Sequence, residues 1–178
     1  MQNPYIFCPT YETDSFIIRL VKESDAVDLL TCYSDPKAQE LFNCDRCFGD
    51  FRMTKLEDMK SCIKAWLMAY ENGDFIRFSI IDKTAFKAVG TIEMFGSVGK
   101  TNVTAGILRV DIASRYEELS YLDELFRVTS EHFFNLFKVT KISTKAIPLA
   151  KNRIDSIKRL GYKEGVITEG NHYYSLTR

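Results

Sequence analysis

The segment ILRVDIASRYEELSYLDELF, residues 107–126, carries the chain from a strand into a helix. Apolar and charged residues alternate in its first part, which predicts a strand over 103–113 with one buried face and one partly wet face. From about 117 to 137, apolar residues recur at every third or fourth position instead, which predicts an amphipathic helix. A further β-prone stretch follows at 138–147. Together these elements predict two parallel strands joined by a right-handed helical crossover.

Similar patterns on both sides of this unit predict further strands and helices. Strands are expected at 16–20, 75–81, 88–95, 103–113, 138–147, 164–168 and 172–177, and helices near 24–33, 54–71, 117–137 and 149–160. Thr54 and Glu57 have the spacing of a capping box at the start of the second helix. Polar turns are expected at 96–102 and 169–171. The alternation of strands and helices predicts a layered α/β (α+β) fold.

The composition indicates a single domain over residues 1–178 that needs no cross-links for stability. Hydrophobic residues make up 46% of the 178 residues, which is enough for a sizeable core. The 24 basic and 24 acidic residues balance, whereas a nucleic-acid-binding surface usually shows a basic excess, so we expect no nucleic-acid partner. The longest apolar runs fall far short of the ~20 residues that span a bilayer, so we expect no membrane association.

The five cysteines, an odd number, and an N-terminus without the features of a secretory signal predict a reduced, cytoplasmic protein. Cys44 and Cys47 form a CxxC motif. A zinc site needs four ligands, and the two histidines, His132 and His172, are distant in sequence, so we expect no metal. The motif also does not open a helix directly after a strand, as thioredoxin-like motifs do. A thiol-based sensor at these two cysteines is one alternative function.

Several short segments, in this order and spacing, resemble the GNAT (Gcn5-related N-acetyltransferase) superfamily, in the branch that acetylates the N-termini of ribosomal proteins. These segments are 16–20 with 24–26, 89–93, Tyr121 with Glu124, Ile147-Pro148, 159–165 and 172–177. The resemblance covers the chain from about residue 16 to its end. It implies a GNAT-type mixed, mostly antiparallel twisted sheet of about six or seven strands, flanked by about four helices.

The resemblance also implies that acetyl-CoA is the co-substrate, held by the 103–113 strand and the start of the next helix. Amide groups at a helix N-terminus, together with the helix dipole, favour a pyrophosphate at such a place. The implied cofactor-binding residues are Val110, Ile112, Ala113, Arg115, Leu119, Ser120, Tyr121 and Asn152. The chain departs from the family at two places. Residues 115–121 lack the two usual glycines, with Glu118 replacing the first, and Ala150 replaces a coenzyme-contacting asparagine.

Transfer of an acyl group to an amine is helped by a general base, and Glu93 is the first candidate. It interrupts an apolar strand, where partial loss of water would make its carboxylate more basic; alternatively, it lies on a wet face of the sheet. Asp111 is the second candidate for a catalytic residue, with a cross-strand ion-pair network around it and Arg109 as the alternative. The expected substrate-binding residues are Trp66, Phe78 and Arg109, and ordinary core packing is the alternative for the two aromatic side chains.

The polar loop at 43–52 is the expected specificity element, because it is long for a connection between two helices. The expected function is transfer of an acetyl group from acetyl-CoA to a primary amine, by direct transfer in a ternary complex. The acceptor amine belongs to a protein N-terminus or a small molecule, and the protein is a monomer or homodimer. Glu118 and Ala150 keep open the alternative of a catalytically degenerate GNAT-like binding or interaction domain.

Overall fold

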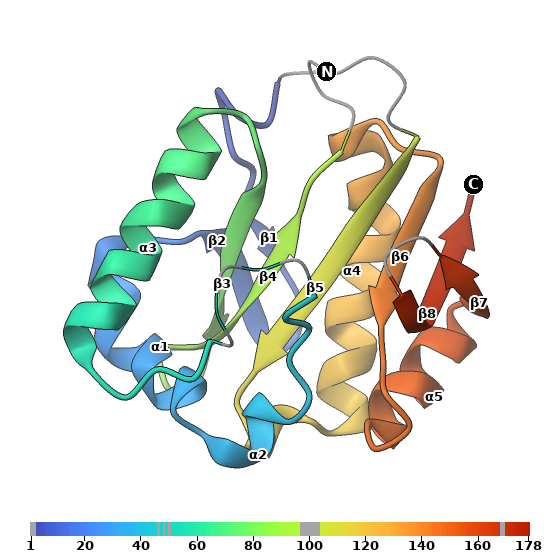
Figure 1. Ribbon diagram of the computed structural model, residues 1–178. Helices are drawn as coiled ribbons and strands as arrows, with labels where there is room; N and C mark the ends of the chain where they lie inside the picture. Colours follow the sequence, from blue (N-terminus) through green and yellow to red (C-terminus); the bar gives the residue numbers. More distant parts are fainter. Residues whose placement is uncertain (1–2, 46, 48, 50, 97–103, 168–169) are drawn as a thin grey trace.

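The computed structural model describes residues 3–45, 47, 49, 51–96, 104–167 and 170–178 (Figure 1). The strands are β1 (Tyr11–Glu12), β2 (Phe16–Leu20), β3 (Ile76–Asp82), β4 (Lys87–Met94), β5 (Ala105–Ile112), β6 (Lys141–Lys145), β7 (Lys163–Ile167) and β8 (Gly170–Thr177). The helices are α1 (Ala26–Tyr33), α2 (Pro36–Gln39), α3 (Leu56–Glu71), α4 (Leu119–Phe137) and α5 (Lys151–Arg159), with single turns of 3-10 helix at Glu23–Asp25 and Ser114–Tyr116. Most of the predicted turn at 96–102 and the first residue of the predicted turn at 169–171 lie outside the described residues.

The strands form one sheet with the order β1-β2-β3-β4-β5-β6-β8-β7. Neighbouring strands are antiparallel except β5 and β6, which run parallel and are joined by α4, as the sequence predicts. The mixed, mostly antiparallel sheet confirms the predicted fold class. Within the described residues it has eight strands rather than six or seven, because β1 adds a two-residue edge strand that is too short to show a periodic pattern. The short α2 likewise raises the number of described α-helices to five.

Asp35 and Pro36, at the expected end of α1, also start α2. The carboxylate of Asp35 accepts hydrogen bonds from two amides of the first turn, at 3.0 and 3.4 Å, and Pro36 opens that turn. The predicted capping box of α3 is wrong, because the helix begins at Leu56 and no side chain caps it. The N-cap position, from which a hydroxyl can cap a helix, is occupied by Lys55. Thr54 lies one residue before it.

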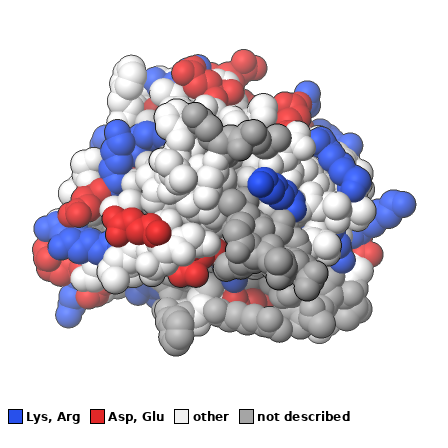
Figure 2. All heavy atoms as spheres, turned by 90° about the horizontal axis from the view of Figure 1, so that it is seen from above, with Lys and Arg blue, Asp and Glu red and all other residues white. Residues whose placement is uncertain are grey.

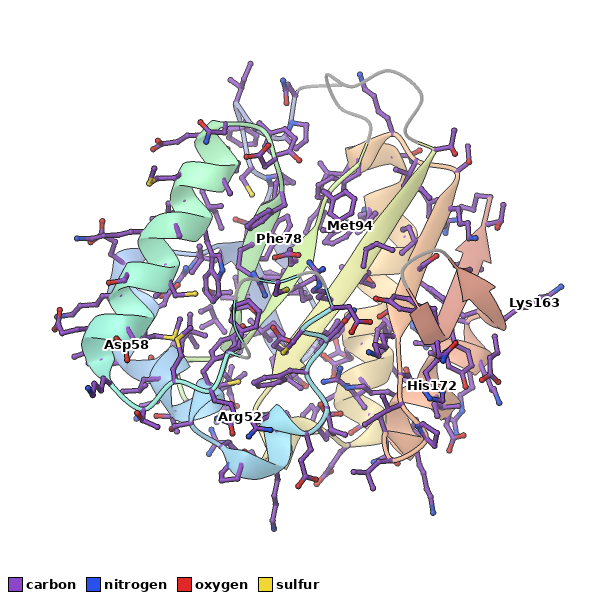
Figure 3. All side chains as sticks on the ribbon, in the orientation of Figure 1. Arg52, Asp58, Phe78, Met94, Lys163 and His172 are labelled. Carbon is purple, nitrogen blue, oxygen red and sulfur yellow. The ribbon has the colours of Figure 1, made fainter. Side chains whose placement is uncertain are left out.

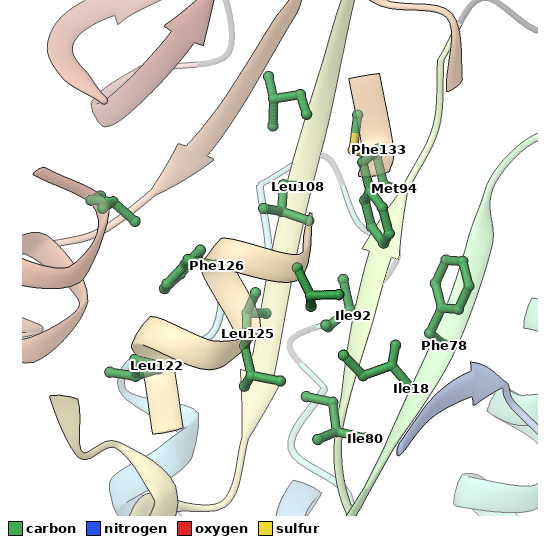
Figure 4. Close-up of a cluster of buried hydrophobic side chains, with 14 of the residues drawn as sticks. Ile18, Phe78, Ile80, Ile92, Met94, Leu108, Leu122, Leu125, Phe126 and Phe133 are labelled. Carbon is green, nitrogen blue, oxygen red and sulfur yellow. The ribbon is translucent and has the colours of Figure 1, made fainter. Parts of the chain in front are cut away.

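The two faces of the sheet differ in chemistry, because successive side chains along a strand point to opposite sides. One face is apolar and packs against α4, with Phe78, Ile92 and Leu108 among the buried side chains (Figure 4). The other face carries buried polar groups such as Arg77 and Glu93 and is covered by α1 and α3. Figure 1 shows α3 in front of the sheet and α4 behind it.

Charged side chains of both signs are interspersed over the face of the molecule seen in Figure 2, in keeping with the equal numbers of basic and acidic residues. In the part of the chain that the structure describes, no helix combines the length and apolar character needed to cross a bilayer.

Candidate active site

Strand β5 parts from β6 about halfway along its length. The parallel pairing starts at Ala105 and Lys141 and ends at Leu108, whereas the pairing of β5 with β4 continues to Ile112. Residues 109–112 therefore have a strand neighbour on one side only, and Figure 1 shows β5 and β6 diverging. Such a split leaves backbone N–H and C=O groups of β5 without a strand partner and able to bind another group.

The helix that follows the split begins with amides that have no partner inside the helix. The first backbone hydrogen bond of α4 runs from Leu122 N–H to the carbonyl of Glu118 at 3.0 Å. The amides of Leu119, Ser120 and Tyr121 precede it and therefore have no acceptor inside the helix. The ring of Tyr121 packs edge-on against a core phenylalanine. Glu118 is exposed at the N-cap position, so its carboxylate can turn towards water. The positive end of the helix dipole favours an anion here.

An ion pair holds together the corner between α4 and α5. Arg153, only 2% exposed, donates from Nε to both carboxylate oxygens of Glu117 at 3.0 Å, and its Nη2 binds the same carboxylate. The side-chain amide of Asn152, a predicted cofactor contact, donates to the backbone carbonyl of Glu117 at 2.7 Å. Ala150 is buried at the N-cap of α5. The charge of Glu117 is thus neutralised beside the start of α4.

The other predicted cofactor residues lie on β5 and in the turn that follows it. Val110 and Ile112 bury their side chains in the core, so only their backbone is placed to face the split. Ala113 and Arg115 line a cavity of about 480 Å³ at the end of β5, together with Lys87 and the carboxylates of Asp28 and Asp35. These positions are consistent with a charged ligand at this end of the strand.

A network of buried charges occupies the α3 face of the sheet. Arg77 on β3 pairs with Glu93 on β4 through Nη2, and its Nη1 donates to Asp111 on β5 at 3.1 Å. Glu93 also pairs with Arg109 on β5. The strand register explains these contacts, because Glu93 lies directly opposite both arginines on its two neighbouring strands. The hydroxyl of Tyr33 on α1 adds a hydrogen bond to Asp111 at 3.0 Å.

This network surrounds both carboxylates that the sequence proposes as catalytic residues. Glu93 is buried rather than on a wet face, and arginines hold both of its oxygens, so its charge is stabilised. Burial raises the pKa of Asp111 above its usual range, although Arg77 opposes the shift. The expected ion-pair network around Arg109 and Asp111 is present. Its centre, Arg77, was not identified from the sequence, although an arginine inside the mostly apolar strand at 75–81 was an available signal.

A second cavity of about 480 Å³, which we call the acceptor cavity, lies between α3 and the sheet. Its walls are mostly aliphatic and aromatic, and Arg77 and Arg109 lie at its polar end. Trp66 lines it, as predicted, with its ring 4.4 Å from the guanidinium of Arg77. The prediction for Phe78 is wrong: its side chain is fully buried against α4, on the opposite face of the sheet (Figures 3 and 4). Neighbours along a strand point to opposite sides, and Arg77 takes the side of the cavity.

Described residues of the 43–52 loop, namely Asp45, Cys47 and Phe51, line the acceptor cavity. The carboxylate of Asp45 accepts hydrogen bonds from Lys145 Nζ on β6, at 2.8 Å, and from the hydroxyl of Tyr173 on β8, at 3.1 Å. The backbone carbonyl of Asp45 accepts a bond from Arg109 Nη2 at 2.8 Å. One loop residue therefore bridges the strands on both sides of the split.

The cysteines and histidines form no second site in the described residues, where no group of three or more His, Cys, Asp or Glu is placed to hold a metal ion. Cys47 lines the acceptor cavity, and its thiol donates to the carbonyl of Asp45 at 3.7 Å. Burial raises the pKa of Cys47, whereas a redox-sensing thiol needs a lowered one. His132 stacks on Tyr11, and His172 is exposed on β8 (Figure 3).

Comparison with known proteins yields similarity at the level of structure. No protein-family model matches the chain, and no curated protein sequence matches it. A ribosomal-protein-S5-alanine acetyltransferase from Vibrio fischeri superposes with a TM-score of 0.73 at 18% identity, over 95% of this chain and 96% of that chain. RimL, a ribosomal L7/L12 α-N-protein acetyltransferase in complex with coenzyme A, superposes with a TM-score of 0.71 at 11% identity, over 95% of this chain and 98% of that chain. A GNAT-family acetyltransferase from Bacillus anthracis superposes with a TM-score of 0.69 at 16% identity, over 95% of this chain and 98% of that chain.

These identities are low, and the likeness concerns the fold. The chain therefore has the fold of the GNAT acetyltransferases, and its structural neighbours include the ribosomal-protein acetyltransferases that its sequence resembles.

Proposed function

We propose that this chain is an N-acetyltransferase that moves an acetyl group from acetyl-CoA to a primary amine by direct transfer. The split between β5 and β6 carries the proposal, because the start of α4 lies at its end and the acceptor cavity lies beside it. A thioester entering from the side of α4 and an amine in the acceptor cavity would meet at residues 109–112. Structural neighbours that are acetyltransferases, one of them solved with coenzyme A, support the same assignment.

In this proposal, backbone groups bind most of the acetyl-CoA. The amides of Leu119, Ser120 and Tyr121 bind the diphosphate, and Arg115 adds a positive charge nearby. The unpaired edge of β5 binds the pantetheine arm and donates an N–H to the thioester oxygen, on which charge develops. The ion pair between Arg153 and Glu117 removes one of the negative charges that would otherwise repel the diphosphate.

The chemistry needs little from the side chains. The amine nitrogen attacks the thioester carbonyl carbon, the C–S bond breaks, coenzyme A leaves as a thiolate, and the amine proton passes to a base. Glu93 is the proposed base, directly or through a water molecule, because it lines the acceptor cavity. Asp111 is more remote from the cavity and orients Arg77. An apolar cavity also favours the neutral amine over its ammonium form, which eases the demand on the base.

Thermal unfolding with and without acetyl-CoA tests the proposal. A ligand at about 100 times its dissociation constant stabilises the folded state by about 2.7 kcal/mol, which corresponds to a rise in Tm of about 5–11 °C for a chain of this length. Arg115→Met should reduce this rise, whereas Arg127→Met, which changes an exposed arginine on α4, should not. Acetylation of an added amine is then followed by mass spectrometry. No rise in Tm at millimolar acetyl-CoA would exclude the proposed function.

The second candidate is a GNAT-like domain that binds a partner without catalysis. Two features favour it: the bonds of Arg153 and Asn152 to Glu117, which tie α5 to the turn before α4, and the absence of the family's glycines there. This candidate predicts no acetyl-CoA binding, so the same thermal experiment separates the two.

Three properties of the chain stay predictions: a single domain over residues 1–178, a cytoplasmic location, and a monomeric or homodimeric state.

A further inference from the structure

We propose that the acceptor is a small apolar monoamine rather than a polycation or a peptide N-terminus. This inference rests on the proposed function, because it names the substrate of the same site. It is argued from the walls of the acceptor cavity, from the charges at its polar end and from the hydrogen-bonding groups that it offers.

The walls of the acceptor cavity include an uncovered apolar face of α3. Cys62, Ala65, Trp66 and Ala69 line the cavity, at the spacings of three and four that place residues on one side of a helix. Ala65 is exposed and Ala69 is half-buried, and both line the cavity. An aliphatic or aromatic ligand body would cover this face and remove apolar area from water. The α3 face thus favours an acceptor with an apolar body.

The charges around the cavity are already paired with one another. The carboxylates among the described lining residues are Asp45 and Glu93, and each is bound by cationic side chains of the protein. Across the network, three carboxylates meet three cations: Asp45, Glu93 and Asp111 with Arg77, Arg109 and Lys145. A polycation would find no unneutralised carboxylate among these residues and would lie close to two guanidinium groups. The cavity therefore selects an amine that can bind in its neutral form.

The same pairing disfavours a peptide. Each residue of an extended peptide brings one N–H and one C=O that need partners when they are buried. Among the polar side chains that line the described part of the cavity, Arg109 and Tyr173 already bond to Asp45, and the Nε groups of Arg77 and Arg109, which have no assigned partner, are buried. A monoamine brings a single polar group, and at the Arg109 end that group reaches the place where β5 leaves β6.

The tryptophan content of the chain gives a direct binding assay. Trp66 is the single tryptophan and lines the cavity, so its fluorescence reports occupancy without any turnover. We expect 2-phenylethylamine to change this fluorescence saturably, and spermidine and tetra-alanine to leave it unchanged at the same concentrations. Because the neutral amine binds, the apparent dissociation constant should rise about ten-fold for each unit by which the pH is lowered below the pKa of the ligand's amine. An equal or larger response to spermidine or to tetra-alanine would overturn the proposal.

A pair of variants on α3 tests the charge argument. Ala69→Glu adds an unpaired carboxylate to the cavity, and Met68→Glu adds the same charge at an exposed neighbour outside the lining. Spermidine should alter Trp66 fluorescence in Ala69→Glu and not in Met68→Glu, and the pH dependence for 2-phenylethylamine should flatten only in Ala69→Glu. If both variants behave alike while circular dichroism shows both folded, the cavity is not the binding site. These measurements omit acetyl-CoA, so loss of the proposed transferase activity and loss of this inference give different results.

Discussion

Replacing Arg77 by methionine should destabilise the fold strongly, because the arginine compensates two buried carboxylates. The side chains of Arg77, Glu93 and Asp111 are 1%, 4% and 1% exposed. In Arg77→Met, Glu93 keeps its partner Arg109, whereas Asp111 keeps only the hydroxyl of Tyr33 as an assigned partner among the described residues. Removing one partner of a buried ion pair costs about 3–5 kcal/mol, which lowers the Tm by about 6–20 °C for a chain of this length.

The loss should depend on pH in a direction set by Asp111. Burial raises the pKa of this carboxyl, so the folded state holds its proton more tightly than the unfolded state does. Its contribution to the free energy of unfolding is therefore greatest below the ordinary carboxyl pKa of about 4 and is lost as the pH rises through the raised value. Without Arg77 the pKa rises further. The loss in free energy of unfolding caused by Arg77→Met should thus be larger at about pH 7 than at about pH 5.

Denaturant unfolding followed by far-UV circular dichroism measures both effects. Adding Asp111→Asn to Arg77→Met should recover most of the lost stability at about pH 7. The control is Lys60→Met, which removes an exposed pair with Glu57 and should cost at most about 0.5 kcal/mol. A deficit for Arg77→Met as small as that of the control, or one that Asp111→Asn does not relieve, would refute the reasoning.

Three further changes test other parts of the site. Gly90→Ala places a Cβ 2.3 Å from the backbone carbonyl of Asp111, so the free energy of unfolding in denaturant should fall by about 1–3 kcal/mol; an unchanged value would mean that β4 and β5 are further apart. Asp45→Asn weakens the bond to Lys145 that holds the 43–52 loop, so steady-state kinetics should show a higher KM for the amine and an unchanged kcat. Glu93→Gln should lower kcat/KM more at neutral than at high pH if Glu93 accepts the proton, whereas an equal loss across the pH range would assign it a structural role.

Periodicity was sufficient to predict the central crossover of the fold. The change from alternation to a helical repeat near residue 113 marks the end of β5, and both flanking strands are long enough to show a pattern. The short elements β1 and α2 span two and four residues, which is too few for a repeat to emerge. Their formation depends on pairing with β2 and on the cap from Asp35.

The candidate site was only partly predictable, because its contacts join residues from different strands. Of the three expected substrate-binding residues, Trp66 and Arg109 line the cavity, whereas Phe78 does not, since the pattern does not tell which face of β3 meets α3. Arg77 was overlooked because its partners become evident only from the register of three strands. The role of Asp45 depends on where its loop lies against β6 and β8, and nothing in the local sequence specifies this position.

Backbone amide hydrogen exchange of the protein, with and without acetyl-CoA, examines the proposed cofactor site at single residues. If the diphosphate binds at the start of α4, the amides of Leu119, Ser120 and Tyr121 should exchange more slowly in the presence of acetyl-CoA, together with those of Val110 and Ile112, which face the open edge of β5. Unchanged exchange at all five amides under saturating acetyl-CoA would contradict acetyl transfer at this split.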